Sequence, residues 1–115
     1  MYKKIAVLLA SYNGTKYIKV QVDSILNQKE VDVEIFISDD LSTDGTIQYL
    51  QDIYKNEKRL VYLESNQKFG GAAKNFFRLI RDVEFSNFDF ISLADQDDIW
   101  YEDKLIRAIK IIEDK

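Results

Sequence analysis

Three carboxylates crowd the end of one apolar run. The segment LADQDDIW, residues 93–100, places Asp95, Asp97 and Asp98 within four positions. Carboxylates this close repel one another unless a cation or hydrogen-bond donors meet them. Residues two apart in an extended chain point to the same side, so Asp95 and Asp97 can address one ligand while Gln96 turns away. Because Mg²⁺ or Mn²⁺ is typically held by one or two carboxylates plus phosphate oxygens, we predict a divalent-cation site here and interpret Asp98 as a helix cap.

A second acidic pair stands in ISDDLSTDGT, residues 37–46. A carboxylate at the carboxyl end of the second strand of an open α/β sheet commonly accepts hydrogen bonds from the ribose or base of a nucleotide. Of the pair, we favour Asp40 for this role. The residues that follow, Ser42, Thr43 and Asp44, are typical of helix N-caps, and we interpret them as capping or loop structure.

Tyr12 lies in LASYNG, where small residues lead into an aromatic side chain. Ala10 and Ser11 would let a flat ring approach the backbone and stack on Tyr12. A turn at Asn13-Gly14, with a tyrosine that covers an edge of the core, explains the same letters. The residues alone leave both interpretations open.

One lysine follows a glycine pair in NQKFGGAAKNFF, residues 66–77. Backbone N–H groups at the start of a helix, together with Lys74 in its first turn, could bind an anion. A lysine in this position is also typical of solvated surface. Lys74 is therefore a candidate ligand for a phosphate, with a surface role as the alternative.

Four β-rich runs alternate with four stretches of helical periodicity, which predicts an α/β fold with a doubly wound, mostly parallel sheet of four βα units. The predicted strands are residues 4–10, 33–38, 59–64 and 88–94. The apolar stripes predicted to enter the core are Ile18, Val22, Ile25 and Leu26, then Ile47, Leu50, Ile53 and Tyr54, then Phe76, Phe77, Ile80 and Val83, and last Leu105, Ile109 and Ile112. Because the carboxyl ends of parallel strands share one edge, we expect the segments around Tyr12, Asp40 and Asp95 to converge.

The composition excludes several classes of protein. A chain of 115 residues with 46% hydrophobic residues suits one compact domain. Cysteine and histidine are absent, so a metal site has only oxygen ligands available. A net charge of −4 disfavours nucleic-acid binding. The early apolar run IAVLLA is too short to span a bilayer, which favours a cytoplasmic protein.

The motifs VLLASYNG, ISDDLSTDGT and LADQDDIW, in this order, resemble the donor-binding half of inverting family-2 glycosyltransferases with the GT-A fold. The resemblance covers the entire chain, and ADQDDIW is similar to the rhamnosyltransferase-like subgroup. It implies a dTDP- or UDP-sugar donor, a Mg²⁺ or Mn²⁺ cofactor, a saccharide or lipid-linked acceptor and a role in cell-surface polysaccharide synthesis. By position, Ala10, Tyr12 and Asp40 would contact the base, Asp95 the ribose or diphosphate and Asp97 the cation, with Lys74 near the nucleotide.

The resemblance also sets expectations for what lies outside these motifs. In the family, the catalytic base comes from a later segment, so the catalytic residue here is unknown and residues 1–115 are expected to form a nucleotide-sugar-binding domain that lacks the acceptor-binding half. Peripheral attachment to the inner face of a membrane and a homo-oligomer are further expectations. The alternatives are a receiver-type, Mg²⁺-binding signalling domain, disfavoured because its acid pair would follow the first strand, and a nucleotide-binding module without catalysis.

Overall fold

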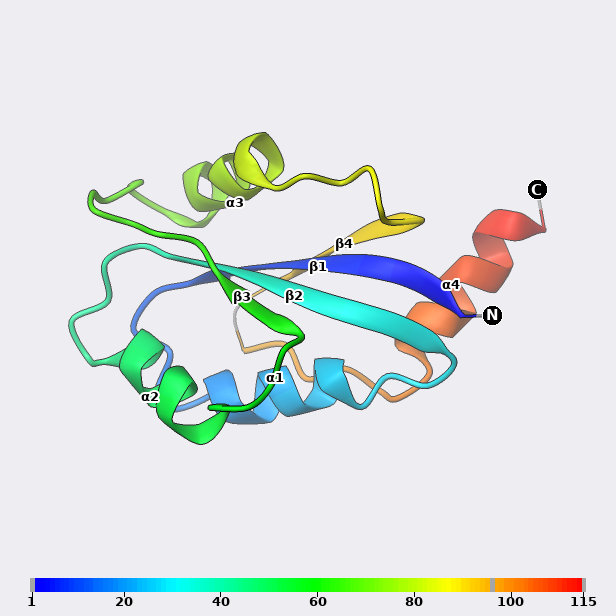
Figure 1. The fold of residues 1–115 in the computed structure, drawn as a ribbon, viewed down its shortest axis with the longest axis horizontal. Coiled ribbons are helices and arrows are strands. Elements are labelled where there is room, and N and C mark those ends of the chain that lie inside the picture. Colours follow the sequence, from blue (N-terminus) through cyan, green and yellow to red (C-terminus); the bar gives the residue numbers. More distant parts are fainter. Residues whose placement is uncertain (1, 96, 115) are drawn as a thin grey trace.

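The computed structural model describes residues 2–95 and 97–114. Its elements, in chain order, are β1 (Lys3–Ser11), α1 (Ile18–Leu26), β2 (Val31–Asp39), α2 (Thr46–Ile53), β3 (Leu60–Tyr62), α3 (Ala72–Asp82), β4 (Phe90–Ala94) and α4 (Lys104–Glu113). The four strands form one parallel sheet in the order β3-β2-β1-β4 (Figure 1). The predicted α/β fold with four βα units is confirmed. Within the described residues, no helix is both long enough and apolar enough to cross a membrane.

Helices cover both faces of the sheet. On one face, α1, α2 and α4 pack against the odd-numbered apolar residues of β1 and β2, and on the other α3 packs against Leu8 and Ala10 (Figure 1). The central strand β1 is therefore buried on both sides. Such a strand reads as a continuous apolar run rather than an alternating one, which explains the letters IAVLLA.

Two strands are shorter than predicted, and both lie at an edge of the sheet. β3 pairs with β2 only from Leu60 to Tyr62. The N–H of Leu63 still donates to the carbonyl of Ile37 at 2.9 Å, after which the chain leaves the sheet. At the other edge, β4 begins at Phe90, because the chain just before it makes a turn closed by a 3.0 Å bond from the N–H of Phe88 to the carbonyl of Phe85.

Part of the predicted core is exposed, which corrects the helical stripes. On α3, Phe77 and Ile80 are 68% and 49% exposed, while Asn75, Arg78 and Leu79 are buried. The buried face of α3 carries polar side chains that bind polar groups of β2 and of the segment after β3. An apolar periodicity in the sequence therefore does not predict which face of α3 is buried. Two end positions, Ile53 and Ile112, are also exposed.

The loops after β1 and β2 lock together and build one side of the sheet's carboxyl edge. Asn13 accepts a hydrogen bond from the N–H of Thr43 at 2.8 Å and donates its own N–H to Ser42 Oγ at 2.8 Å. Asp44 accepts bonds from Thr15 and from the N–H of Thr46, at the start of α2. The predicted loop role of Ser42, Thr43 and Asp44 is confirmed by these bonds, whereas none of the three is the N-cap of α2, which is Gly45 and has no side-chain cap.

Candidate functional site

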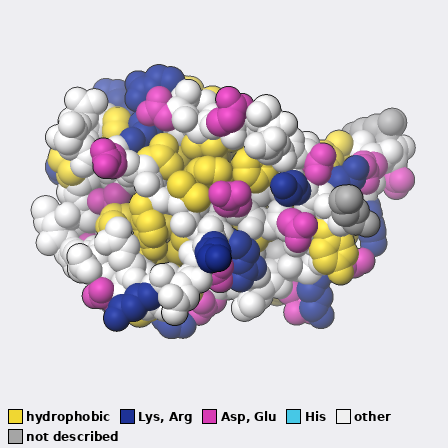
Figure 2. All heavy atoms as spheres, viewed as in Figure 1, with side chains coloured by type: hydrophobic (Ala, Val, Ile, Leu, Met, Phe, Trp, Pro, Cys, Tyr) yellow, Lys and Arg dark blue, Asp and Glu magenta, His cyan; other side chains and the backbone are white. Residues whose placement is uncertain are grey.

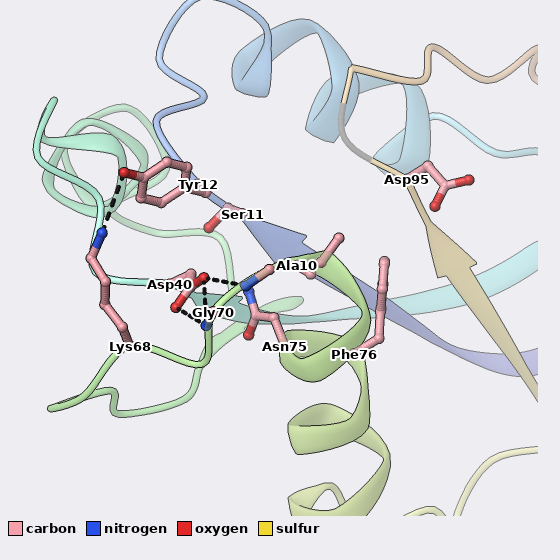
Figure 3. Close-up of a pocket in the computed structure, with 11 residues that line it drawn as sticks. Ala10, Ser11, Tyr12, Asp40, Lys68, Gly70, Asn75, Phe76 and Asp95 are labelled. Atoms are coloured by element: carbon pink, nitrogen blue, oxygen red, sulfur yellow. Dashed lines mark hydrogen bonds between the residues drawn. The ribbon is translucent and has the colours of Figure 1, made fainter.

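A pocket of about 360 Å³ opens at the carboxyl edge of the sheet, between the ends of β1 and β4 and the start of α3 (Figure 3). Its lining residues are Ala10, Ser11, Tyr12, Asp40, Lys68, Gly70, Gly71, Ala72, Asn75, Phe76 and Asp95. Four predicted site residues, Ala10, Tyr12, Asp40 and Asp95, thus share one pocket although they come from three separate motifs. Their roles toward a ligand stay predictions.

Asp40 holds the loop that forms one wall of the pocket. Its carboxylate accepts the N–H groups of Phe69, Gly70 and Gly71, at 3.2 Å from Gly70 and 3.0 Å from Gly71 (Figure 3). Gly70 and Gly71 have φ angles of 89° and 130°, a region that favours glycine and that lets consecutive N–H groups turn toward one carboxylate. The glycine pair therefore serves Asp40 as an anion-binding loop inside the protein itself.

These hydrogen bonds also set the charge of Asp40. Burial alone would raise the pKa of the Asp40 carboxyl, but the N–H donors of Phe69, Gly71 and Gly70 outweigh it and hold the pKa below its ordinary value of 3.8. Lys68 lowers the pKa further through its positive charge. Asp40 is therefore a fixed negative charge on the pocket wall at neutral pH.

Lys68 is a pocket residue that the sequence analysis missed. Its Nζ lies 3.4 Å from Tyr12 Oη and 4.8 Å from the centre of the Tyr12 ring (Figure 3). Lys68 precedes the glycine pair in the loop between β3 and α3, where no periodic pattern marks it. The bonds between Asp40 and this loop help to place Lys68 beside Tyr12, a residue 56 positions earlier in the chain.

Lys74, the predicted phosphate ligand, is exposed in the first turn of α3 and is not among the residues that line the pocket. A methyl group added at Gly70 would lie 4.0 Å from Lys74 Nζ, so the ammonium group sits beside the loop that Asp40 holds. Its predicted role stays a prediction.

The acidic segment after β4 supplies the opposite wall. Asp95 is exposed and lines the pocket across from Lys68 (Figure 3). Asp97 is exposed, has a φ of 62° and does not line the pocket. The predicted orientation of Gln96 lies outside the described residues. Asp98 does not cap a helix, because α4 begins only at Lys104; its N–H instead donates to the carbonyl of Asp95 at 3.2 Å.

The donor set fits a cation only if a ligand completes the site. Among residues 2–95 and 97–114, no cluster of three or more acidic, histidine or cysteine side chains could hold a metal ion. No described residue donates a hydrogen bond to the side chain of Asp95, which is exposed and lines the pocket. One or two carboxylates with the remaining ligands from phosphate and water is a coordination that Mg²⁺ accepts.

A buried arginine on α3 holds the chain segment that leads to the pocket residue Lys68. Arg78 on α3 is 9% exposed and donates to Ser38 Oγ and Ser65 Oγ, both at 2.8 Å, and to the carbonyl of Glu64. Its guanidinium group also lies 5.2 Å from the centre of the Phe69 ring. Arg78 therefore ties the segment that leads to Lys68 onto α3.

The parallel sheet with helices on both faces and a pocket outside its carboxyl edge defines an open α/β domain of the Rossmann-like type. Residues 6–115 match the model of glycosyl transferase family 2, and the chain belongs to this family. This confirms the family that the three motifs indicated, and it decides against the receiver-type alternative.

Three similar proteins illustrate the relationship. The dTDP-rhamnosyl transferase RfbG of Shigella flexneri is 51% identical over 88% of this chain and 35% of its own length. Chondroitin synthase of Escherichia coli is 36% identical over 74% of this chain and 12% of its own. The crystal structure of TarS from S. aureus superposes with a TM-score of 0.80 at 27% identity, covering 96% of this chain and 32% of that one. The chain thus spans about a third, or less, of the length of each of these three proteins.

Proposed function

We propose that this chain binds a nucleoside-diphosphate sugar with Mg²⁺ or Mn²⁺ and forms the donor site of a glycosyltransferase that extends a saccharide or lipid-linked acceptor. The observation that carries the proposal is the meeting of Tyr12, Asp40, Lys68 and Asp95 around one pocket. The names of the relatives support a role in polysaccharide synthesis, and TarS has been crystallised with UDP-GlcNAc. A dTDP- or UDP-sugar is accordingly the proposed donor.

The two ends of the pocket would bind different parts of the ligand. At the Asp40 end, the exposed ring of Tyr12 offers a surface for stacking and Ala10 leaves room for a base. Asp40 is the charged acceptor for a nucleoside N–H or hydroxyl group, and a carboxylate has lone pairs beyond those that the three backbone donors use. Lys68, above Tyr12, offers a positive charge to the anionic ligand.

At the opposite end, an acidic rim would repel a diphosphate unless a cation lay between them. Asp95 and Asp97 would hold Mg²⁺ or Mn²⁺ there. The bound ion would supply a Lewis acid that stabilises the charge on the departing nucleoside diphosphate. Asp95, on the pocket rim, keeps its carboxylate available for this purpose.

Thermal unfolding in the presence of nucleotides tests the proposal. A ligand that binds only the folded state raises the melting temperature according to its affinity. We expect UDP or dTDP to raise it more than GDP or CMP, and MnCl₂ to enlarge the rise. No shift with any of the four nucleotides, with or without MnCl₂, would contradict the proposal.

The cation assignment has a matched pair of variants in the same segment. Asp97→Asn and Asp98→Asn each remove one exposed charge next to the same site. We expect Asp97→Asn to abolish the gain in nucleotide affinity that MnCl₂ gives, with the melting temperature of the free protein unchanged. Asp98→Asn should keep most of that gain, and equal losses in both variants would refute a specific role for Asp97.

Location and partners follow the same proposal. We propose action in the cytoplasm at the inner face of a membrane, with peripheral attachment and a homo-oligomer as further expectations. Because the net charge is −4, we do not expect the chain to bind nucleic acid.

A further inference from the structure

Three polar side chains of one helical stripe lie beneath the acidic segment. Gln21 and Ser24 belong to α1, and Gln28 follows just after its end. Their spacing of three and four residues places them on one side of a helical turn. Gln21 and Gln28 are only 1% and 7% exposed, and buried amides of this kind are expected to have hydrogen-bond partners.

All three side chains bond to the main chain of residues 95–105. The Gln21 amide donates to the carbonyl of Asp95, and Ser24 Oγ accepts the N–H of Trp100 at 3.1 Å. Gln28 donates to the carbonyl of Tyr101 at 2.6 Å and accepts the N–H of Leu105 at 3.0 Å. We call these three residues the α1 strap.

The strapped segment has little regular structure of its own. No helix or strand covers the described residues between Ala94 and Lys104, and Asp97 has a φ of 62°, which is uncommon for a residue with a side chain. A backbone like this keeps one conformation only where its surroundings fix it. Within the described chain, the Asp95 carbonyl is held by Gln21 and by the N–H of Asp98.

We propose that the α1 strap positions the acidic segment for its ligand, and that Gln21 is the residue that sets the main chain at Asp95. The inference rests on the proposed function, because the group to be positioned is the carboxylate assigned to the cation. Gln21 acts through the backbone of Asp95 and is a positioning residue. Gln28 holds the far end of the segment, next to α4, by the same chemistry.

Because Gln21 and Gln28 bond to opposite ends of the segment, a variant of Gln28 is a matched control for a variant of Gln21. In both Gln21→Met and Gln28→Met a flexible side chain of similar length replaces a buried amide. Each variant removes hydrogen bonds to the same segment, at its two ends. A purely structural role predicts that both lower the stability and that neither changes how strongly Mn²⁺ enhances nucleotide binding.

The first measurement is calorimetric titration of the 115-residue chain with UDP and with dTDP, with and without MnCl₂. For Gln21→Met we expect the enhancement by Mn²⁺ to fall about fivefold to tenfold, the scale of one lost hydrogen bond, with affinity in the absence of Mn²⁺ unchanged. For Gln28→Met the enhancement should stay within about twofold of the parent on the same scale. An unchanged enhancement in Gln21→Met would overturn the positioning role.

The second measurement needs no ligand and separates this inference from the proposed function. Hydrogen exchange of the Trp100 and Leu105 amides reports the strap directly, because both N–H groups are bonded to it. We expect Ser24→Ala, a mild change at a half-buried site, to speed exchange at Trp100 about fivefold or more, the factor that one lost hydrogen bond gives. Gln28→Met should do the same at Leu105. Parent-like exchange in both variants would refute the strap, whereas faster exchange in a protein that never binds nucleotide would refute only the proposed function.

Discussion

Asp40 shows how one side chain can serve the fold and the site together. Its three backbone donors fix the loop 69–71, and the same loop brings Lys68 to Tyr12. Replacing the carboxylate by an amide would leave one oxygen to face three N–H groups and would place an NH₂ group against them. The charge of Asp40 is therefore needed even before any ligand arrives.

The stability of the protein should depend on pH through Asp40. Its pKa is lowered in the folded state, so the unfolded chain binds the proton more tightly and folding is favoured above the ordinary pKa of 3.8. That contribution is complete at neutral pH and is lost as the pH falls through 3.8 and then through the lower folded value. We expect Asp40→Asn to reduce the free energy of unfolding at pH 7, by about 1–3 kcal/mol, and to reduce it less at pH 3. Urea denaturation at both pH values measures this.

Asp32 supplies the control for this experiment, because it is an exposed aspartate on β2. Asp32→Asn should leave the unfolding free energy close to that of the parent at both pH values. An equal effect of Asp40→Asn at pH 7 and pH 3 would show that its charge does not stabilise the loop.

At the scale of elements, parallel strands made much of the site predictable. The motifs around Ala10, Tyr12, Asp40 and Asp95 stand at strand ends, and parallel strand ends share an edge, so their meeting followed from the order of elements alone. The family resemblance added the expected roles of these residues but not their geometry.

What could not be predicted depends on polar contacts between distant segments. Glutamines on a helix, such as Gln21 and Gln28, are typically exposed to solvent. Here they are buried because the segment after β4 packs on them. Lys68 stands in a loop without periodicity. Asp98 precedes an apparent helix start, but the strapped backbone delays α4 to Lys104. In each case the deciding hydrogen bond joins residues dozens of positions apart.

The α3 helix gives a prediction at this scale. Arg78 is buried and bonds the segment after β3, whereas its neighbour Arg81 is exposed and pairs only with Asp82 among the described residues. We expect Arg78→Met to lower the free energy of unfolding by about 2–4 kcal/mol, because several charged hydrogen bonds are lost and a carbonyl is left without its donor.

Arg81→Met is the control for Arg78→Met, since it removes the same charge from the same helix. It should cost less than about 1 kcal/mol, as is usual for exposed ion pairs. Equal denaturation midpoints for the two variants in urea would contradict the supporting role of Arg78.

At the scale of the whole molecule, one apolar area is left uncovered. Ile91 and Leu93 of β4 pair in register with Ala6 and Leu8, so they lie on the face of the sheet that α3 covers elsewhere, yet they are 51% and 49% exposed. Figure 2 shows hydrophobic side chains gathered on the face beside α3. Uncovered apolar areas are typical of interfaces. The expected association of this chain with further protein stays a prediction.

The described residues offer few carboxylates near the pocket that could act as the general base of a sugar transfer. Inverting transfer needs a general base within hydrogen-bond reach of the acceptor hydroxyl. The carboxylates that line the pocket within the described residues are Asp40, engaged by three N–H groups, and Asp95, assigned to the cation. We expect the 115-residue chain to bind UDP or dTDP while releasing negligible nucleotide from dTDP-rhamnose or UDP-GlcNAc when acceptor is added. Release that depends on the acceptor would show that a base is present among these residues.

The position of β1 between β2 and β4 also has a consequence for the order in which the strands pair during folding. Its pairing with β2 joins residues 28 apart, such as Ile5 and Val33, whereas its pairing with β4 joins residues 85 apart, such as Ile5 and Phe90. Closing the longer loop costs about 1 kcal/mol more in chain entropy, so we expect β4 to dock last. A chain emerging from the ribosome would then build the Asp40 end of the pocket before Asp95 arrives to complete it. Pulse-labelled hydrogen exchange during refolding should show the β4 amides protected after those of β1 and β2, and simultaneous protection would argue against this sequence of events.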